Sequence, residues 1–256
     1  MNLHNKYIFF QTLYFLVQKE LSVRYKGSFL GYLWAILNPL AFALVYFIAF
    51  SLVLRFDIEN YPIILITALF PWVWISTSLV QGSLSFRSNS NLIKKIHFNY
   101  ILLPLSNILH DSIHFILSVP IIFLFLMLNN FDFYFSWIWQ IPLMVLVQVC
   151  FLLPLVLVLS ILNVFLRDVE HMINVILSLL FFLTPIVYPI SLVPDEYLSI
   201  YNINPLIIII ENWRSIFFNG IIDYLDIFIL TLISIIVTFF ARFFFIRYRM
   251  KFAEYL

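Results

Sequence analysis

Side chains that could carry a proton or bind a metal ion gather at one place in this sequence, at His110, Asp111 and His114. The two histidines are four residues apart, as two metal ligands on one helix face are, but no His-Glu-x-x-His frame surrounds them. Asp111 and His114 also belong to a polar helix face that Asn107 and Ser118 extend at spacings of four. This face could bond neighbouring helices together, line a polar path, or serve as a proton relay or metal site.

A second polar stripe recurs at spacings of 3, 4 and 3 and consists of Ser78, Gln81, Ser85 and Ser88. It allows the same interpretations. Patterns of enzyme chemistry are missing: no serine has a nucleophile-elbow pattern, and the four glycines lack the spacing of a phosphate loop followed by Lys and Ser or Thr. We therefore expect a non-catalytic chain with no catalytic residue and no metal site, which binds no ATP or other cofactor itself.

The composition indicates that lipid is the solvent of this chain. It is 64% hydrophobic and 11% charged over 256 residues, whereas soluble domains carry about 25% charged residues. The net charge of +1 provides no basic field for nucleic acid. Stretches long and apolar enough to cross a hydrocarbon core of about 30 Å cover residues 32–54, 61–85, 100–128, 135–165, 172–192 and 224–246. The sequence therefore predicts an all-α, polytopic membrane protein with six transmembrane helices.

Basic residues orient these predicted spans, because cytoplasmic loops are enriched in Lys and Arg. When both termini are placed in the cytoplasm, all of the 14 Lys and Arg residues except Arg55 and Arg214 fall on the cytoplasmic side. The outer segments are acidic instead, and they include Asp57, Asp195 and Asp223. We therefore expect a multi-pass membrane protein with both termini in the cytoplasm.

Shorter segments complete the expected single domain of residues 1–256. Residues 1–30 predict an amphipathic helix on the membrane surface, with Gln11, Gln18 and Ser22 on its polar face, and a weak first span is the alternative. Residues 205–218 are too short to span comfortably and predict one or two re-entrant helices near the outer mouth of a pathway. Residues 31–247 would form the six-span bundle, and residues 248–256 a short cytoplasmic tail.

Two cytoplasmic segments are candidates for contact with a soluble partner. Residues 91–98 predict a short helix, capped by Ser90 or Asn91, which docks into a groove on a partner or lies on the membrane surface. The charge cluster of residues 163–171 is either a second contact surface or a solvated loop. The residues that we assign to the partner contact are Asn91, Leu92, Lys94, Lys95, Ile96, Phe98, Arg167 and Asp168.

Tryptophans concentrate toward the predicted outer ends of the spans, at Trp72, Trp74, Trp137, Trp139 and Trp213. This distribution is typical of an aromatic belt at the membrane interface. The alternative is that some of the many aromatic rings line a channel. Such a channel would suit a glycan, because sugar rings present apolar C–H faces that stack on aromatic rings.

One run resembles the start of the permease subunit of polysaccharide ABC exporters: Arg24-Tyr-Lys-Gly-Ser-Phe-Leu-Gly-Tyr-Leu-Trp34, followed by Asn38-Pro39. These proteins are type-2 ABC exporters, and they include the Wzm-like permeases for O-antigen, capsule and teichoic acid. The resemblance covers nearly the whole chain, including the loop of residues 165–168 and the pair at residues 204–205. The opening run is the most specific part of the resemblance.

The resemblance implies that the chain is the membrane-spanning permease of an ATP-driven exporter in the bacterial inner membrane. A homodimer of permeases would work with two copies of a cytoplasmic ATPase subunit, which would bind ATP and Mg²⁺. The substrate would be a polysaccharide linked to undecaprenyl diphosphate. The loop helix would couple to the ATPase, and Arg24 and Lys26 would lie near the lipid phosphates at the entry. An outer gate within residues 194–218 would include Asn204, Pro205 and Trp213.

Helix faces that mix aromatic and polar groups are expected to line the translocation path, because a lipid-facing surface would not favour them. A long glycan must slide, so its path should bind weakly at many places. The first predicted span carries such side chains at spacings of four, and the fifth carries them on one face. With the entry residues Arg24 and Lys26, the predicted path comprises Trp34, Asn38, Phe42, Tyr46, Phe181, Thr184 and Tyr188.

Other classes of protein remain as alternatives. A type-2 ABC permease for a drug or a lipid would share the same fold. A proton-coupled secondary transporter would need intramembrane acids as relays, for which Asp111 with His110 and His114 is the candidate, but the sequence shows no internal inverted repeat. A membrane glycosyltransferase or phosphatase would need clustered carboxylates or His and Arg motifs, which the sequence lacks.

Overall fold

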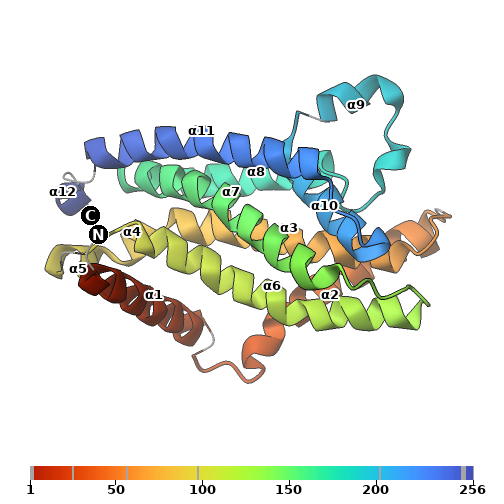
Figure 1. The fold of residues 1–256 in the computed structure, drawn as a ribbon, viewed down its shortest axis with the longest axis horizontal. Helices are drawn as coiled ribbons and strands as arrows, with labels where there is room; N and C mark the ends of the chain where they lie inside the picture. Colours follow the sequence, from red (N-terminus) through yellow and green to blue (C-terminus); the bar gives the residue numbers. More distant parts are fainter. Residues whose placement is uncertain are drawn as a thin grey trace.

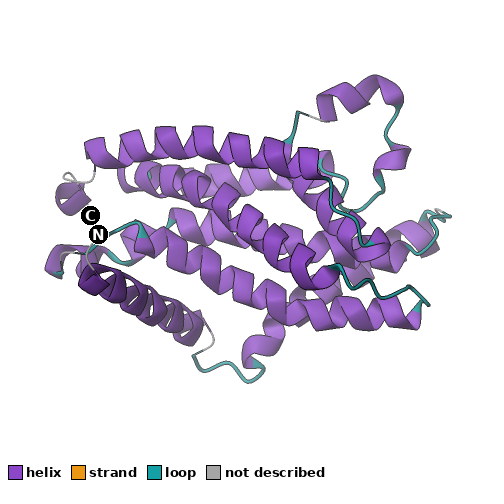
Figure 2. Cartoon of the chain, viewed as in Figure 1, coloured by secondary structure: helices purple, strands orange, loops and turns teal. Residues whose placement is uncertain are grey.

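The computed structural model of the protein describes residues 3–24, 26–55, 57–96, 98–201, 203–248 and 252–255, which form helices and no strands (Figures 1 and 2). The predicted all-α class is therefore confirmed. The helices, with 3-10 and π turns labelled η, are α1 (Leu3–Arg24), η1 (Gly31–Leu33), α2 (Trp34–Phe47), η2 (Ile48–Val53), α3 (Tyr61–Ser83), α4 (Ser85–Ser88), α5 (Ser90–Lys95), α6 (Leu102–Leu128), α7 (Trp137–Phe165), α8 (Val169–Leu183), η3 (Ile190–Leu192), α9 (Asp195–Tyr201), α10 (Pro205–Asn219), α11 (Tyr224–Tyr248) and α12 (Phe252–Tyr255).

Five helical segments of the described chain are long and apolar enough to cross a membrane. They are α2 with its flanking turns (Gly31–Val53), α3, α6, α7 and α11. These segments match five of the predicted spans closely. The chain is therefore a helical, polytopic membrane protein.

The predicted fifth span, residues 172–192, is not one continuous helix. α8 has 15 residues, which extend over about 22 Å, less than a hydrocarbon core of about 30 Å. The helix ends before Thr184, whose ψ of 138° is extended. The following Pro185 disfavours helical backbone at the residue before it, which explains the break. Residues 184–187 are buried, so protein covers this non-helical backbone.

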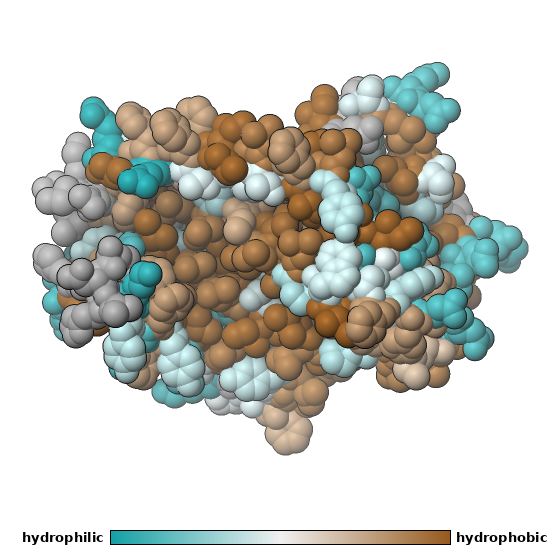
Figure 3. Space-filling model, in the orientation of Figure 1, coloured by the Kyte–Doolittle hydropathy of each residue, from teal (hydrophilic) through white to brown (hydrophobic). Residues whose placement is uncertain are grey.

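The long helices run side by side, and both chain ends lie at one end of the bundle together with α4, α5 and α12 (Figure 1). α9 lies at the opposite end. On the face shown in Figure 3, polar side chains gather at the two ends of the molecule and apolar side chains cover the helices between them. The predicted tail, residues 248–256, contains α12, while residues 249–251 and 256 lie outside the described part of the chain.

α1 packs against α6 through a face that includes Phe9, Leu13 and Leu16. On its other side, Gln11 and Gln18 are exposed as predicted, but Tyr7, Tyr14 and Phe15 are exposed beside them. The predicted separation into one polar and one apolar face is therefore not found. Residues 1, 2 and 25 of the predicted N-terminal segment lie outside the described residues.

α3 is the central helix of the bundle and packs against α2, α6, α7, α8 and α10. Most of its side chains are buried. The approach to α7 is close at Gly82, where an added Cβ would lie 2.3 Å from Val156 Cγ1. A glycine at this position therefore lets the two helices meet.

Most of the tryptophans expected at the membrane interface lie in the core instead. The side chains exposed by 6% or less are Trp72, Trp74, Trp137 and Trp213, whereas Trp139 is 44% exposed. Their indole N–H groups explain part of this burial: Trp137 donates to Ile216 O at 2.6 Å and Trp213 to Gln148 Oε1 at 2.6 Å. The belt interpretation is therefore wrong for these four residues.

Candidate functional site

A groove between α2, α3 and α8 brings together four of the residues predicted to line a path. Its volume is about 470 Å³. Asn38, Phe42 and Tyr46 line it from α2, and Phe181 lines it from α8. The spacing of four places the α2 residues on one helix face. Asn38 and Phe42 are exposed, so this face is accessible within the groove.

Aromatic rings form one wall of the groove. The rings of Tyr46 and Phe181 stack with centroids 5.5 Å apart, and Trp72 meets Phe181 edge-on at 5.7 Å. Such a pair contributes about 0.5–1.5 kcal/mol beyond the burial of its area. Sequence reasoning missed Trp72 as a groove residue, because its position near a span end suggested the interface.

Polar side chains line the groove as well, namely Ser76, Thr77 and Gln81 from α3 and Asn174 and Ser178 from α8. Apolar side chains complete the lining: Leu69, Val73, Val80, Leu177 and Phe182. The Thr77 hydroxyl donates to Val73 O at 2.7 Å and keeps lone pairs that can accept hydrogen bonds. Among the lining residues of the groove in the described chain, none is charged. This lining can stack on a ligand and exchange weak hydrogen bonds with it, and it offers no nucleophile paired with a base.

A smaller cavity of about 170 Å³ adjoins the groove. The two share residues of α2 and α3, including Asn38 and Thr77. Arg24 and Trp34, both predicted path residues, line the smaller cavity. Lys26, the other predicted entry residue, is exposed in the turn after α1. The predicted path residues of α1 and α2 thus lie along two adjoining hollows.

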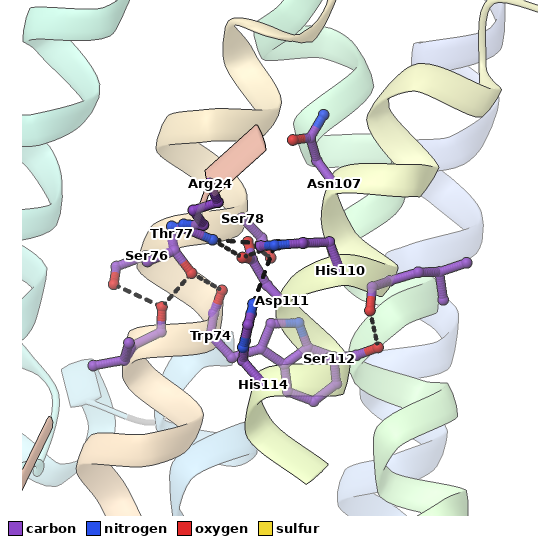
Figure 4. Close-up of polar contacts among 12 residues, drawn as sticks. Arg24, Trp74, Ser76, Thr77, Ser78, Asn107, His110, Asp111, Ser112 and His114 are labelled. Atoms are coloured by element: carbon purple, nitrogen blue, oxygen red, sulfur yellow. Dashed lines mark hydrogen bonds and ion pairs between the residues drawn. The ribbon is translucent and has the colours of Figure 1, made fainter. Parts of the chain in front are cut away.

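Asp111 joins three helices at the wall of this cavity (Figure 4). Its Oδ1 accepts a hydrogen bond from Arg24 Nη1 of α1 at 2.7 Å, and its Oδ2 accepts one from Ser78 Oγ of α3 at 3.0 Å. His110 Nδ1 lies 3.0 Å from Asp111 Oδ1. The Asp111 side chain is 3% exposed and that of Arg24 is 34% exposed, so the pair is buried on one side only.

The two polar stripes of the sequence therefore meet at Ser78 and Asp111. Other members bond within their own helix instead: Asn107 donates to Leu103 O at 3.0 Å and Ser118 to Phe115 O at 2.6 Å. No group of three side chains suited to a metal ion occurs among the described residues. Of the interpretations left open, hydrogen bonding between helices fits the contacts of Ser78 and Asp111.

Thr184 and Tyr188 do not line the groove, contrary to the prediction. Thr184 is fully buried, and its hydroxyl accepts a hydrogen bond from Asn204 Nδ2 at 3.2 Å. Tyr188 donates from its hydroxyl to Phe182 O at 2.7 Å and contacts the hydroxyl of Tyr201 at 3.0 Å. Because the helix ends before Thr184, these residues leave the face of Phe181 and connect Tyr201 and Asn204 to the end of α8.

The predicted outer-gate residues lie on α10, which is one continuous helix. Asn204 caps it, since its Oδ1 accepts a hydrogen bond from Leu206 N at 3.0 Å, and Pro205 takes the first helical position. Trp213 is fully buried and lies against Phe217 in the core. The structure therefore separates Trp213 from the other two predicted gate residues.

Arg214 is a buried cation of α10 that the sequence analysis left outside any site. It is 8% exposed, donates from Nη2 to Pro185 O at 2.7 Å, and pairs with Glu211 one turn away. The bond to Pro185 holds α10 against the non-helical segment that follows α8. Nothing in the local sequence signals this contact, because 29 residues separate the two partners.

The predicted partner helix is shorter than expected. α5 ends at Lys95, and Ile96 is extended with φ −131° and ψ 132°. Ile96 is 53% exposed, and Lys94 and Lys95 are exposed beside it. Leu92 and Phe98 are partly buried against other helices of the same chain. The surface left free for a partner is thus the end of α5 and Ile96.

The start of α5 also differs from the prediction. Neither Ser90 nor Asn91 occupies the N-cap position, which belongs to Asn89 and has no side-chain capping bond. The Asn89 amide donates to Ser85 O at 2.8 Å, and its Oδ1 accepts a hydrogen bond from Lys19. This pairing connects the loop helix with α1. Asn91 is exposed.

Arg167 and Asp168, the second predicted contact, are exposed in the turn between α7 and α8. Asp168 is the N-cap residue of α8, and its carbonyl accepts a hydrogen bond from Met172 N at 3.0 Å. Nearby, Arg87 Nη1 donates to Asn163 Oδ1 at 3.0 Å and joins α4 to α7. Both predicted residues are accessible to a partner, and their contact with an ATPase subunit stays a prediction.

Comparison with known proteins places the chain among membrane transporters. A family model described as ABC-2 type transporter matches residues 11–218. Two proteins of Klebsiella pneumoniae, each called O-antigen export system permease protein RfbA, are similar: one is 40% identical over 96% of this chain and 95% of its own length, the other 39% identical over 100% of both. A protein of the same name from Myxococcus xanthus is 35% identical over 93% of each chain.

Proposed function

This chain belongs to the ABC-2 type transporter family, and on that premise we propose that it is the permease subunit of an ATP-driven exporter of lipid-linked polysaccharide. The groove carries this proposal, because rings, hydroxyls and amides without charge suit a sliding glycan. The relatives named as O-antigen export permeases support O-antigen as the polysaccharide. These features favour a glycan over a drug or a lipid.

The proposal assigns ATP hydrolysis to a separate subunit. Families of this type pair a permease with an ATP-binding subunit, and the described groove offers no catalytic constellation. We propose two such subunits, binding ATP and Mg²⁺, and a second copy of this chain. α2 and α11 bury few of their side chains, which supplies apolar surface for lipid and for the second copy.

The proposed location is the bacterial inner membrane, with both termini in the cytoplasm. Both chain ends lie at one end of the bundle, next to α4 and α5 (Figure 1). Lys94 and Lys95 are exposed at this end, as expected for a cytoplasmic surface. In this orientation the undecaprenyl diphosphate of the substrate would enter near Arg24 and Lys26, while Asn204 and Pro205 lie on the outer side.

Reconstitution into vesicles tests the function directly. The permease should co-purify with its ATPase subunit, and ATP should drive movement of an undecaprenyl-linked O-polysaccharide across the vesicle membrane. Movement is read by a lectin that is confined to the receiving side. Transport driven by a proton gradient without ATP, or no co-purification of an ATPase subunit, would contradict the proposal.

Alanine at Phe42 or Tyr46 is expected to slow export about two- to tenfold, because one lost ring contact is worth about 0.5–1.5 kcal/mol. The amount of permease in the membrane should not change for Phe42→Ala, since Phe42 is 51% exposed, and export is expressed per permease because Tyr46 is half-buried. Phe239→Ala is the matched control, because Phe239 is 76% exposed on α11 and away from the groove. Initial export rates per permease provide the measurement. Equal rates for all three variants would remove the groove from the path.

A further inference from the structure

A second apolar core lies at the end of the bundle that holds both chain ends. It is separate from the main core and joins side chains of α1, α4, α5, α6, α7, α11 and α12. Phe86 of α4, Ile93 of α5, Phe245 of α11 and Phe252 of α12 are all buried in it. The loop helix region is thus not an independent hairpin, because its apolar side faces this core.

Phe252 is the residue that closes this second core. Its side chain is 0% exposed although it lies four residues from the end of the sequence. Its ring centroid lies 4.9 Å from that of Phe86 and 6.2 Å from that of Phe245. α12 also packs against α5 and α7. The burial of its ring therefore holds α12 against the bundle.

The contacts of α12 link the loop helix region with two long helices, α11 through Phe252 and α7 through Tyr255. Phe86 belongs to α4, directly before α5, while Phe245 belongs to α11. α12 touches α7 as well, where Tyr255 packs on Phe165 with ring centroids 4.9 Å apart. On the other side, Lys19 of α1 bonds to Asn89 between α4 and α5. The α4–α5 segment is therefore held from both flanks.

We propose that α12 is a C-terminal clasp (Phe252–Tyr255), with Phe252 as a positioning residue that fixes the α4–α5 segment to α7 and α11. The inference rests on the proposed coupling of the loop helix to an ATPase subunit. A movement of α5 caused by the ATPase subunit is transmitted to α7 and α11 only when the α4–α5 segment is rigidly attached to them. Without Phe252, α4 and α5 lose their contact with α11 and bend locally, so the movement is absorbed there.

Phe252→Ala tests the clasp in the reconstituted complex of permease and ATPase subunit. The ATPase subunit should still co-purify and hydrolyse ATP, while glycan exported per ATP hydrolysed falls about five- to tenfold. Phe252→Leu keeps an apolar side chain at this position and should restore most of the ratio. Phe243→Ala is the control, since Phe243 is 61% exposed on α11 and lies outside the second core, and its ratio should stay near that of the wild type.

Phe86→Ala should reproduce the defect, and the double variant with Phe252→Ala should be no worse than either single variant. A normal ratio of export to hydrolysis in Phe252→Ala would overturn the clasp. A loss explained wholly by less permease in the membrane would also overturn it, because Phe252 would then serve folding alone. If the ATPase subunit fails to co-purify with Phe252→Ala but still co-purifies with Phe86→Ala, α12 is a docking surface and the clasp is wrong. Failure of the wild type to bind an ATPase subunit would instead refute the proposed function.

Discussion

Replacement of Ile96 by Asp is expected to abolish export and to release the ATPase subunit. Ile96 is 53% exposed just beyond the end of α5, so the permease itself should tolerate the change. The substitution removes the apolar burial of the isoleucine in the contact with the partner. The new carboxylate must also be desolvated there, which costs free energy. Losses at such central positions exceed about 2 kcal/mol, so we expect binding to weaken by more than about thirtyfold.

Ile203→Asp is the matched control for this prediction. Ile203 is 78% exposed two residues before α10, outside the predicted partner contact, so the same substitution there should leave the complex intact. Pull-down of the ATPase subunit and export in cells are measured for both variants. Full pull-down and normal export with Ile96→Asp would show that the ATPase subunit does not bind at the end of α5.

Replacement of Asp111 by Ala is expected to destabilise the folded permease by about 3–5 kcal/mol before any discount for solvent, because it removes one partner of a buried ion pair. Ser78 loses its acceptor as well, and Arg24 loses a charge partner. The Arg24 side chain is 34% exposed and can turn toward water, which places the result near the lower end of that range. Thermal unfolding in detergent, followed by size-exclusion chromatography, measures the loss.

Asp111→Asn should recover part of that stability, since an amide oxygen still accepts from Ser78. Asp132→Ala is the control, because Asp132 is exposed in the turn after α6 and should change stability by about 0.5 kcal/mol or less. Wild-type stability of Asp111→Ala would show that the pair with Arg24 contributes nothing. The polar stripe of α6 would then owe its presence to a function and not to helix packing.

Local pattern predicted the helices and the α2 face of the groove. Spacings of four along one helix fix which side chains share a face, so Asn38, Phe42 and Tyr46 could be grouped without a structure. The same reasoning was wrong for Thr184 and Tyr188, because it assumed a helix through Pro185. The sequence stays hydrophobic across that proline, but the helix ends before it.

Contacts between residues far apart in the sequence could not be predicted from local sequence patterns. The four misplaced tryptophans are apolar residues near span ends, and only the packing of α3, α7 and α10 decides that they face inward. The burial of Phe252 has no local signal either, since apolar and charged residues are mixed over residues 248–256 without a helical period that marks one residue as buried. The pair of Asp111 and Arg24 joins residues 87 positions apart, so the sequence could mark Asp111 as needing a partner but could not identify it.

The lining of the groove has a consequence for selectivity. Because none of its described lining residues is charged, the wall places no formal charge against a passing ligand. Neutral and acidic sugar units then meet the same surface, and ionic strength has no screened attraction there to weaken. Under the proposed function, discrimination between glycans of different charge has to reside outside this groove, at the entry, at the exit or on the partner subunits.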